Sequence, residues 1–354
     1  MDHLILSCRP GFESECAAEM TERAGALGIY GYAKTAAGSG WVLFVTQHSQ
    51  GASTLIEQLP FRELVFTRQW LASAGRVDDL PAHDRVGPLL HAARELPECG
   101  ELHVDCPDSA ATESLAVLCR KLTSPAAQAL RKAGVLSAKR TRRLPRLHCY
   151  FVSGDAAYVG ISHPRNSSRH EGGIPRLRFP AKAPSRSTLK LEEALLFFLS
   201  VKEREHRLQP GMSAVDLGAA PGGWTWQLVQ RHLRVTAVDN GPMQPALMES
   251  GLVVHEREDG FRYVPTRPVD WMVCDMAAIP MQVAERMALW FAEGWCKQAI
   301  FNLKLPMKKR YQAVCDCRER IETRLNAAGV PFVLDFKQLY HDREEVTAYL
   351  RQPD

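Results

Sequence analysis

Polar and charged residues follow the ends of successive strands that the sequence predicts in the second half of the chain. These positions are the glycine turn 218–223, Asp239, Asp259, Asp275, Lys304 and, before the last strand, Glu345. In open α/β sheets ligands bind outside the carboxyl ends of the strands, so we expect these groups to surround one site. An aspartate at this edge can accept hydrogen bonds from ribose hydroxyls. The pattern therefore predicts a nucleotide-type cofactor beside lysine and carboxylate groups.

The glycine turn follows a short apolar strand, 214–217, and precedes a predicted helix. Glycine has no Cβ and tolerates positive φ, so a ligand can approach the backbone closely there. The turn is not a dinucleotide fingerprint, because Ala220 and Pro221 stand where a second glycine is needed, and no Gly-Lys-Ser/Thr follows for a phosphate-binding loop. We predict cofactor contacts from Gly218, Ala220, Pro221, Gly222, Gly223 and Trp224, and from Asp239, Asp259 and Asp275 at the same edge.

The elements that must position these residues begin after residue 187. The sequence predicts strands at 213–217, 234–239, 252–255, 269–274, 298–303, 332–336 and 346–350, and helices at 223–231, 281–296 and 308–328. Only residues 337–344 separate the last two strands, which is too short for a parallel crossover. The predicted fold is therefore α/β: a doubly wound, mostly parallel sheet with one antiparallel strand that begins at the edge where the others end.

The first half of the chain predicts smaller modules. Residues 1–60 have the element order of an α+β ferredoxin-like module, and residues 61–164 predict a second α/β unit that begins with a strand at 64–70. Residues 165–186 contain prolines, glycines and alternating basic residues and predict an extended linker. Residues 187–354 then form the catalytic domain.

Basic residues are concentrated in the middle of the chain. Residues 120–190 contain sixteen lysines and arginines but only two acids, a net charge of +14, whereas the whole chain carries +4 and the remainder therefore −10. Such a block indicates a polyanionic partner. We expect phosphate contacts that do not read base sequence from one helix end and the loop after it. The residues predicted to bind this polyanion are Arg131, Lys132, Lys139, Arg140, Arg142, Arg143 and Arg146.

The composition is that of a soluble globular protein, with 354 residues of which 45% are hydrophobic and 24% charged. No signal peptide and no membrane-spanning stretch is predicted, so we expect no membrane partner. The ten cysteines lack paired Cys-x-x-Cys spacing, which indicates a reducing cytoplasm and predicts no metal site. The sequence does not settle the oligomeric state, and a monomer is the expectation.

Together, the turn and the charged residues resemble a known family. Residues 216–224, DLGAAPGGW, are similar to the S-adenosylmethionine motif of the FtsJ/RrmJ-type ribose 2′-O-methyltransferases, which have a Rossmann-like fold. Residues 187–193, STLKLEE, resemble that family's first catalytic lysine segment, which adds Ser187 to the cofactor site and Lys190 to the catalytic site. The resemblance implies a catalytic tetrad of Lys190, Asp275, Lys304 and Glu345. In it, Lys304 either removes the hydroxyl proton as a base or, as an ammonium, stabilises the developing alkoxide.

The whole chain is similar to the RlmM-type group of this family, which modifies large-subunit ribosomal RNA and carries an N-terminal THUMP domain, an RNA-binding module. This resemblance implies 2′-O-methylation of a cytidine in the peptidyl-transferase region, on ribosomal RNA or an early assembly intermediate. One departure is the sequence LPMKK after Lys304, which lacks the glycines of the stand-alone FtsJ proteins. That difference bears on how the substrate is held.

Other functions also fit parts of the sequence. Another structured RNA such as tRNA is an alternative substrate, and a base-directed methyltransferase would share the cofactor turn. Against amino-group methylation, Asp275 is followed by Met-Ala-Ala where those enzymes have Pro-Pro-aromatic. A nicotinamide dehydrogenase would share the fold and Asp239 but lacks the second fingerprint glycine here. A non-catalytic RNA-binding protein would have no use for the tetrad.

Overall fold

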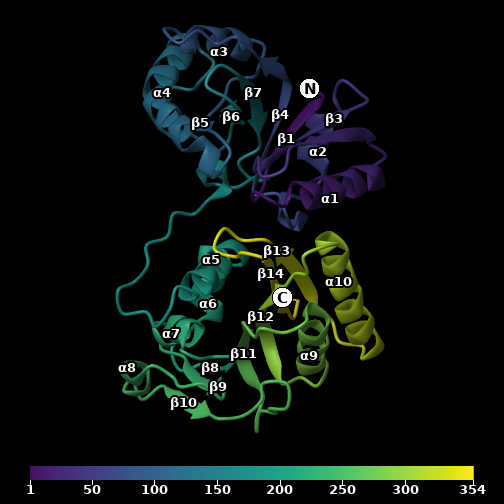
Figure 1. Cartoon of the computed structure of the whole chain (residues 1–354), viewed down its shortest axis with the longest axis vertical. Coiled ribbons are helices and arrows are strands. Elements are labelled where there is room, and N and C mark those ends of the chain that lie inside the picture. Colours follow the sequence, from purple (N-terminus) through teal and green to yellow (C-terminus); the bar gives the residue numbers. More distant parts are fainter. Residues whose placement is uncertain (354) are drawn as a thin grey trace. The chain divides into compact units, whose positions relative to one another are not determined.

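The computed structural model describes residues 1–353, and the chain divides into two compact units, Met1–Pro175 and the residues from Arg176 onwards. Each unit contains one seven-stranded sheet with helices packed against it (Figure 1). Among the residues described, no helix is both long enough and apolar enough to cross a lipid bilayer.

The second unit has the strand order β10-β9-β8-β11-β12-β14-β13. The strands are β8 Ser213–Leu217, β9 Arg234–Val238, β10 Val253–Glu256, β11 Val269–Cys274, β12 Cys296–Lys304, β13 Val333–Lys337 and β14 Glu345–Arg351. Strand β14 runs antiparallel to both of its neighbours, whereas the other pairs are parallel. This arrangement confirms the predicted doubly wound sheet with one reversed strand.

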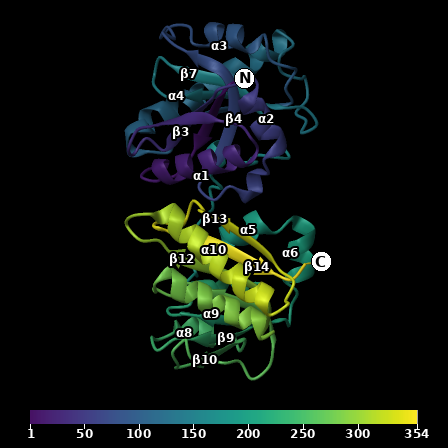
Figure 2. The ribbon, with the colours of Figure 1, turned by 90° about the vertical axis from the view of Figure 1, so that its right-hand side faces the viewer.

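Helices cover both faces of this sheet. They are α5 Thr188–Phe198, α6 Val201–Arg207, α7 Gly223–Val229, α8 Pro245–Met248, α9 Pro280–Ala292 and α10 Arg310–Ala327. Helices α5, α6 and α7 lie on one face, and α9 and α10 lie together on the other (Figures 1 and 2). The central strands are apolar on both sides because both sides are covered. The short helices α6 and α8 are too brief to leave a periodic signal in the sequence.

The first unit has the strand order β2-β3-β1-β4-β7-β6-β5. Its strands are β1 His3–Ser7, β2 Gly31–Thr35, β3 Trp41–Thr46, β4 Gln69–Val77, β5 Glu101–Asp105, β6 Arg146–Phe151 and β7 Ala157–Ser162, and its α-helices are α1 Glu13–Ala26, α2 Gly51–Gln58, α3 Val86–Ala93 and α4 Glu113–Lys132. Strand β4 pairs with β1 and with β7, so the two predicted modules share one continuous sheet. The ferredoxin-like part includes β4 and extends past the predicted boundary at residue 60.

The strand predicted at 64–70 begins later than expected, at Gln69. The backbone amides of Val65 and Phe66 donate to the carboxylate of Glu19, at 2.6 and 2.9 Å, instead of joining a ladder. Residues 64–66 are apolar and buried, as strand residues are, so their sequence predicts a strand even though a side chain of α1 binds two of their amides. The apolar pattern therefore predicted the start of β4 five residues too early.

The first half of the predicted linker 165–186 is built into the first unit. The side-chain amide of Asn166 donates to the carbonyl oxygens of Ile56 and Leu59, both at 2.9 Å. The indole of Trp70 donates to the carbonyl oxygen of Asn166 at 2.7 Å. These bonds correct the prediction of a free extended linker, because they fix its first residues to the sheet.

Candidate active site

Four elements of the second unit bring the predicted catalytic residues together. Lys190 lies in the first turn of α5, and Asp275 directly follows β11. Lys304 is the last residue of β12, and Glu345 is the first residue of β14. Because β14 is antiparallel to β12, Lys304 and Glu345 are partners in the strand register. The reversed strand thus places its first carboxylate at the edge where the parallel strands end.

The four side chains form a closed ring of ion pairs in which each lysine contacts both carboxylates. The Nζ of Lys190 lies 3.2 Å from an Oδ of Asp275 and also contacts Glu345. The Nζ of Lys304 contacts the carboxylates of Asp275 and Glu345. The side-chain amide of Asn302 donates to Asp275 at 3.0 Å. Asn302 was not predicted from the sequence, because an asparagine inside an apolar strand carries no motif.

Lys304 is the most accessible member of the ring, with 30% of its side chain exposed against 16% for Lys190, 15% for Asp275 and 4% for Glu345. Burial lowers the pKa of Lys304, but the carboxylates of Asp275 and Glu345 outweigh this effect and raise the pKa above its usual value. Lys304 is therefore an ammonium ion at neutral pH. Its greater exposure makes it the member of the ring most open to a substrate.

The glycine turn lies between β8 and α7, beside this ring. Gly222 has φ +114°, and a Cβ at this position would lie 2.5 Å from the side chain of Leu247. Gly223 packs so closely against Ser185 and Ser187 that a Cβ would lie 2.4 and 2.2 Å from their hydroxyl oxygens. Larger residues at either position would push apart the segments that form the turn.

Asp239 fixes the turn to the next strand. The amides of Ala220 and Gly241 donate to its two carboxylate oxygens at 3.0 and 2.7 Å. Pro221 follows a cis peptide bond in the same turn. Asp259 lies in the exposed loop after β10, and its neighbour Gly260 approaches the sulfur of Met276, next to Asp275. The predicted cofactor residues Gly218, Ala220, Pro221, Gly222, Gly223, Asp239, Asp259 and Asp275 thus gather at one edge of the sheet.

The side chain of Trp224, a predicted cofactor-binding residue, packs inside the domain. Trp224 is buried in the core, and its indole donates to the carbonyl oxygen of Ser187 at 3.0 Å. The side chain of Gln227 donates to the carbonyl oxygen of Thr188 at 3.2 Å. Trp224 therefore holds the start of α5, which carries Lys190, against α7, and its indole is not available to a cofactor.

A buried carboxyl group lies on β8 just before the turn. Asp216 on β8 is fully enclosed and accepts a hydrogen bond of 2.6 Å from the hydroxyl of Thr225. Burial raises its pKa to about 7, and the nearby carboxylate of Asp275 adds to the rise. A buried acid in an apolar strand resembles an ordinary core position until its surroundings are known.

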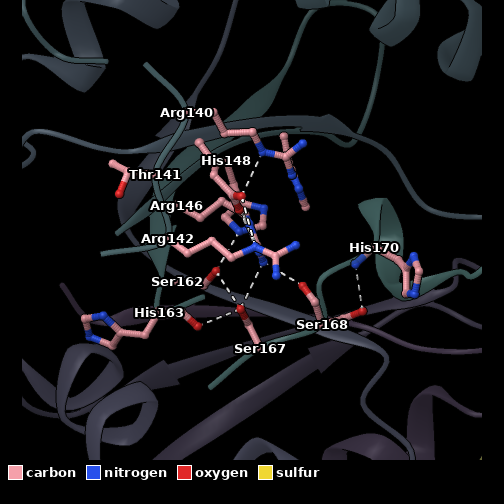
Figure 3. A network of polar contacts seen from close by, with 12 residues as sticks. Arg140, Thr141, Arg142, Arg146, His148, Ser162, His163, Ser167, Ser168 and His170 are labelled. Carbon is pink, nitrogen blue, oxygen red and sulfur yellow. Dashed lines mark hydrogen bonds and ion pairs between the residues drawn. The ribbon is translucent and has the colours of Figure 1, made fainter. Parts of the chain in front are cut away.

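Most of the predicted RNA-binding residues are exposed, but Arg146 is not. Arg146 is fully buried, and its guanidinium donates to Glu101 at 2.9 and 3.0 Å and to the carbonyl oxygen of Ser168 (Figure 3). This network corrects the prediction for Arg146, which binds the protein's own carboxylate and cannot reach a phosphate. The exposed members are Arg131, Lys132, Lys139, Arg140, Arg142 and Arg143.

A hollow of about 620 Å³ lies beside the exposed arginines in the first unit. Its basic lining comes from Arg142, Arg143, His163 and Arg165, and its acidic lining from Glu57. Segments from the ferredoxin-like part and from the second part of the unit both line it. The sequence could not predict this combination, because residues 56–60 and 163–166 meet only in the folded sheet.

Three protein-family models match successive parts of the chain. Residues 1–71 match the RlmM ferredoxin-like domain, residues 84–163 match the N-terminal region of ribosomal RNA large subunit methyltransferase M, and residues 183–305 match the FtsJ-like methyltransferase. Ribosomal RNA large subunit methyltransferase M of Cellvibrio japonicus is 54% identical over 352 residues, covering 99% of this chain and 99% of that protein. The chain belongs to the ribosomal RNA large subunit methyltransferase M family.

Another member of the methyltransferase M family, from Edwardsiella ictaluri, is 50% identical over 353 residues, with 99% of this chain and 94% of that protein covered. Among solved structures, TrmN from Thermus thermophilus aligns with 100% of both chains at 17% identity and a TM-score of 0.38. Membership of the methyltransferase M family confirms the FtsJ-type and RlmM-type resemblance. The THUMP identity of residues 61–164 stays a prediction.

Proposed function

We propose that the chain transfers the methyl group of S-adenosyl-L-methionine to a ribose 2′-hydroxyl of large-subunit ribosomal RNA. The ring of Lys190, Asp275, Lys304 and Glu345 carries this proposal, since base methylation has no need of two lysines held by two carboxylates. Its relatives are named for methylation of the same class of RNA. We further propose a cytidine in the peptidyl-transferase region as the target, on the basis of the family resemblance.

The residues around the glycine turn fit S-adenosyl-L-methionine. Close packing at Gly222 and Gly223 fixes the backbone of the turn, and Asp239 and Asp259 offer carboxylate oxygens to ribose hydroxyls. When bound, this cofactor supplies an activated methyl group. The catalytic and cofactor residues all come from one chain, so we propose that a monomer is sufficient.

Of the two roles predicted for Lys304, the raised pKa favours the charged one. A protonated Lys304 would bind the ribose 2′-oxygen and stabilise the negative charge that grows there as the hydroxyl proton passes to solvent water. Asp275 and Glu345 hold the ammonium in place, and Lys190 balances their charge. The protein thus contributes alignment and electrostatics to a reaction whose methyl donor is already activated.

The basic surface of the first unit supports the proposed RNA substrate. We propose that residues 61–164 act as a THUMP-like RNA-binding module and that the hollow lined by Arg142, Arg143 and Arg165 receives the RNA backbone. Phosphate contacts would position the RNA, and the ring in the second unit would select the ribose hydroxyl.

Incubation of the purified chain with methyl-labelled cofactor and RNA tests the proposal. Protein-free large-subunit RNA, an early assembly intermediate and tRNA serve as parallel substrates, followed by digestion to nucleosides. We expect label in 2′-O-methylcytidine from one of the two large-subunit substrates, and labelling that is roughly 10²–10³-fold slower with Lys304→Ala. Label on a base, or in tRNA alone, would contradict the proposal.

A further inference from the structure

Three side chains with no part in the proposed reaction converge in the first unit. His103 and Asp105 are two residues apart on β5, so they leave the same face of the strand. His148 on β6 lies opposite His103 in the parallel register. All three are buried, with exposed fractions of 3%, 6% and 0%. The sequence did not reveal this cluster, because His148 lies far along the chain from the other two.

Among the residues that the structure describes, three ligand-type atoms of this cluster have no hydrogen-bond partner. They are Nδ1 of His103, Oδ2 of Asp105 and Nδ1 of His148. The carboxylate oxygen lies 3.8 Å from the first nitrogen and 3.7 Å from the second, and one ligand atom of each residue lies within 4.8 Å of those of the other two. A buried polar atom without a partner destabilises the folded chain, so three in one place call for an occupant.

A chain of hydrogen bonds determines which ring nitrogen of a neutral His148 carries the proton. The hydroxyl of Ser167 donates to the carbonyl oxygen of His163 at 2.7 Å, so it accepts from the hydroxyl of Ser162 at 3.3 Å (Figure 3). Ser162 has then used its only proton and must accept from Nε2–H of His148 at 2.8 Å. In the neutral ring of His148, Nδ1 is therefore the nitrogen without a proton, and it lies 3.7 Å from the carboxylate of Asp105.

We propose that His103, Asp105 and His148 bind a divalent transition-metal ion of the zinc type. Two imidazole nitrogens and one carboxylate oxygen are a ligand set that such ions favour. Ligands about 2.1 Å from one zinc ion lie about 3.4 Å apart at tetrahedral angles, so small side-chain rotations would close the 3.7 and 3.8 Å distances around it. Ser162 is the outer partner that orients the ligating imidazole of His148.

The negative charge at this position comes from Asp105, whose carboxylate is itself one of the proposed ligands. The guanidinium of Arg146 on β6 is paired with Glu101 at 2.9 and 3.0 Å, and Arg140 and Arg142 contact the same carboxylate. The backbone amide of Gly172 donates a hydrogen bond to Asp105, so the segment that follows β7 is linked to the same cluster. Because all three ligands are buried, the ion has a structural role.

The proposed ion would cross-link the edge of the first sheet. Strand β5 is the last strand in the order and pairs only with β6 among the named strands. An ion shared by β5 and β6 would secure this edge, and through Asp105 and Gly172 it would also secure the segment that follows β7. That segment begins with His163, which lines the basic hollow.

Zinc uptake by the full chain tests the proposal. The chain is stripped with a chelator, and binding of added Zn²⁺ is measured by equilibrium dialysis and by the melting temperature. We expect one zinc ion per chain and a higher melting temperature. We also expect at least a tenfold loss of affinity in His103→Gln and Asp105→Asn, but not in His83→Gln, which changes an exposed histidine of the same unit. Failure of the wild-type chain to bind zinc, or equal binding by all variants, would overturn the proposal.

If the variants do not fold, X-ray absorption of the zinc-loaded wild-type chain identifies the atoms that bind the ion. The proposal requires nitrogen and oxygen neighbours with the multiple-scattering pattern of two imidazoles. A shell dominated by sulfur would instead assign the ion to some of the ten cysteines and would overturn it. Neither measurement uses methyl transfer, so the outcome does not depend on the proposed function.

Discussion

At the scale of single residues, the charge of Lys304 separates the two mechanisms considered for the ring. Two carboxylates raise its pKa, so the ammonium form dominates in the folded protein before substrate binds. A base must lose its proton before it can accept another, whereas an electrostatic partner works in the charged form. The choice between the mechanisms therefore depends on whether a permanently charged residue can replace the lysine.

We predict that Lys304→Ala lowers kcat by roughly 10²–10³-fold, as expected for loss of one electrostatic contact to the reacting oxygen. Lys304→Arg should retain much more of the rate, because arginine keeps the positive charge but cannot serve as a base. Initial rates of methyl transfer at saturating cofactor measure both. Lys297→Ala, on the same strand and far more exposed, is the control. An arginine variant as inactive as the alanine variant would contradict the charged role.

Asp216 makes stability depend on pH. Its pKa is about 7 in the folded chain against an ordinary value of 3.8, so the proton favours the folded state. The stabilisation is complete below about pH 4 and is lost as the pH rises towards 7, a change of roughly 4 kcal/mol. We predict that Asp216→Asn lacks this loss, so the unfolding free energy of the variant rises relative to wild type between pH 4 and 7.

Denaturant unfolding at several pH values measures this difference. Asp155→Asn, which changes an exposed carboxylate, is the control and should follow the wild-type curve. Parallel curves for wild type and Asp216→Asn would show that Asp216 is ionised throughout and would refute the assignment.

At the scale of elements, helix α5 and the reversed strand β14 assemble the ring. The carboxylate of Glu193 on α5 accepts hydrogen bonds from the amides of Tyr340 and His341 at 2.8 and 2.9 Å. These residues belong to the connection between β13 and β14, which ends at Glu345. Glu193 therefore couples the helix that carries Lys190 to the strand that begins with Glu345.

We predict that Glu193→Ala lowers kcat without a comparable change in cofactor affinity, because it frees the connection that places Glu345. It should also cost about 1–3 kcal/mol of stability, since two backbone amides lose their acceptor. Glu193→Gln should recover part of the rate, because it keeps one acceptor oxygen. The neighbouring variant Glu192→Ala, which removes only an ion pair with Arg231, is the matched control. Equal rates for the two alanine variants would argue against the coupling.

The elements around the ring could be predicted from the sequence because their signals are local. Short apolar strands, a glycine turn and a connection too short for a crossover together predicted β8, β11, β12 and the reversal of β14. The contacts that lock these elements could not be predicted. Glu193, Asn302 and the indole of Trp224 act through partners distant in the chain, and nothing local marks a buried polar residue that meets such a partner.

At the scale of the whole molecule, the chain combines a first unit with a basic surface, which we propose binds RNA, with a second unit that carries the ring. The sequence predicted the basic block, but it could not separate Arg146, which is buried against Glu101, from the exposed arginines around it. It also divided the first unit at residue 60, because pairing of β4 with both β1 and β7 depends on contacts between distant segments.

We predict that replacing Arg142, Arg143 and Arg165 with alanine weakens RNA binding and reduces its dependence on salt. The variant makes fewer phosphate contacts, so its binding releases fewer counterions. Filter binding between 50 and 200 mM salt gives the slope. A variant that loses the exposed residues Lys34, Arg94 and Arg324 has the same net charge and is the matched control. An equal slope for the two variants would place the RNA on another surface.

We propose that the chain uses this ring of lysines and carboxylates to methylate a ribose hydroxyl of large-subunit ribosomal RNA. The most direct test is a map of 2′-O-methyl groups in ribosomal RNA from cells that lack the protein, complemented with wild type or Lys304→Ala. We predict that one 2′-O-methylcytidine of the large-subunit RNA disappears in the deletion, returns with wild type and stays absent with Lys304→Ala. An unchanged map, or a lost methyl group that was carried by a base, would contradict the claim.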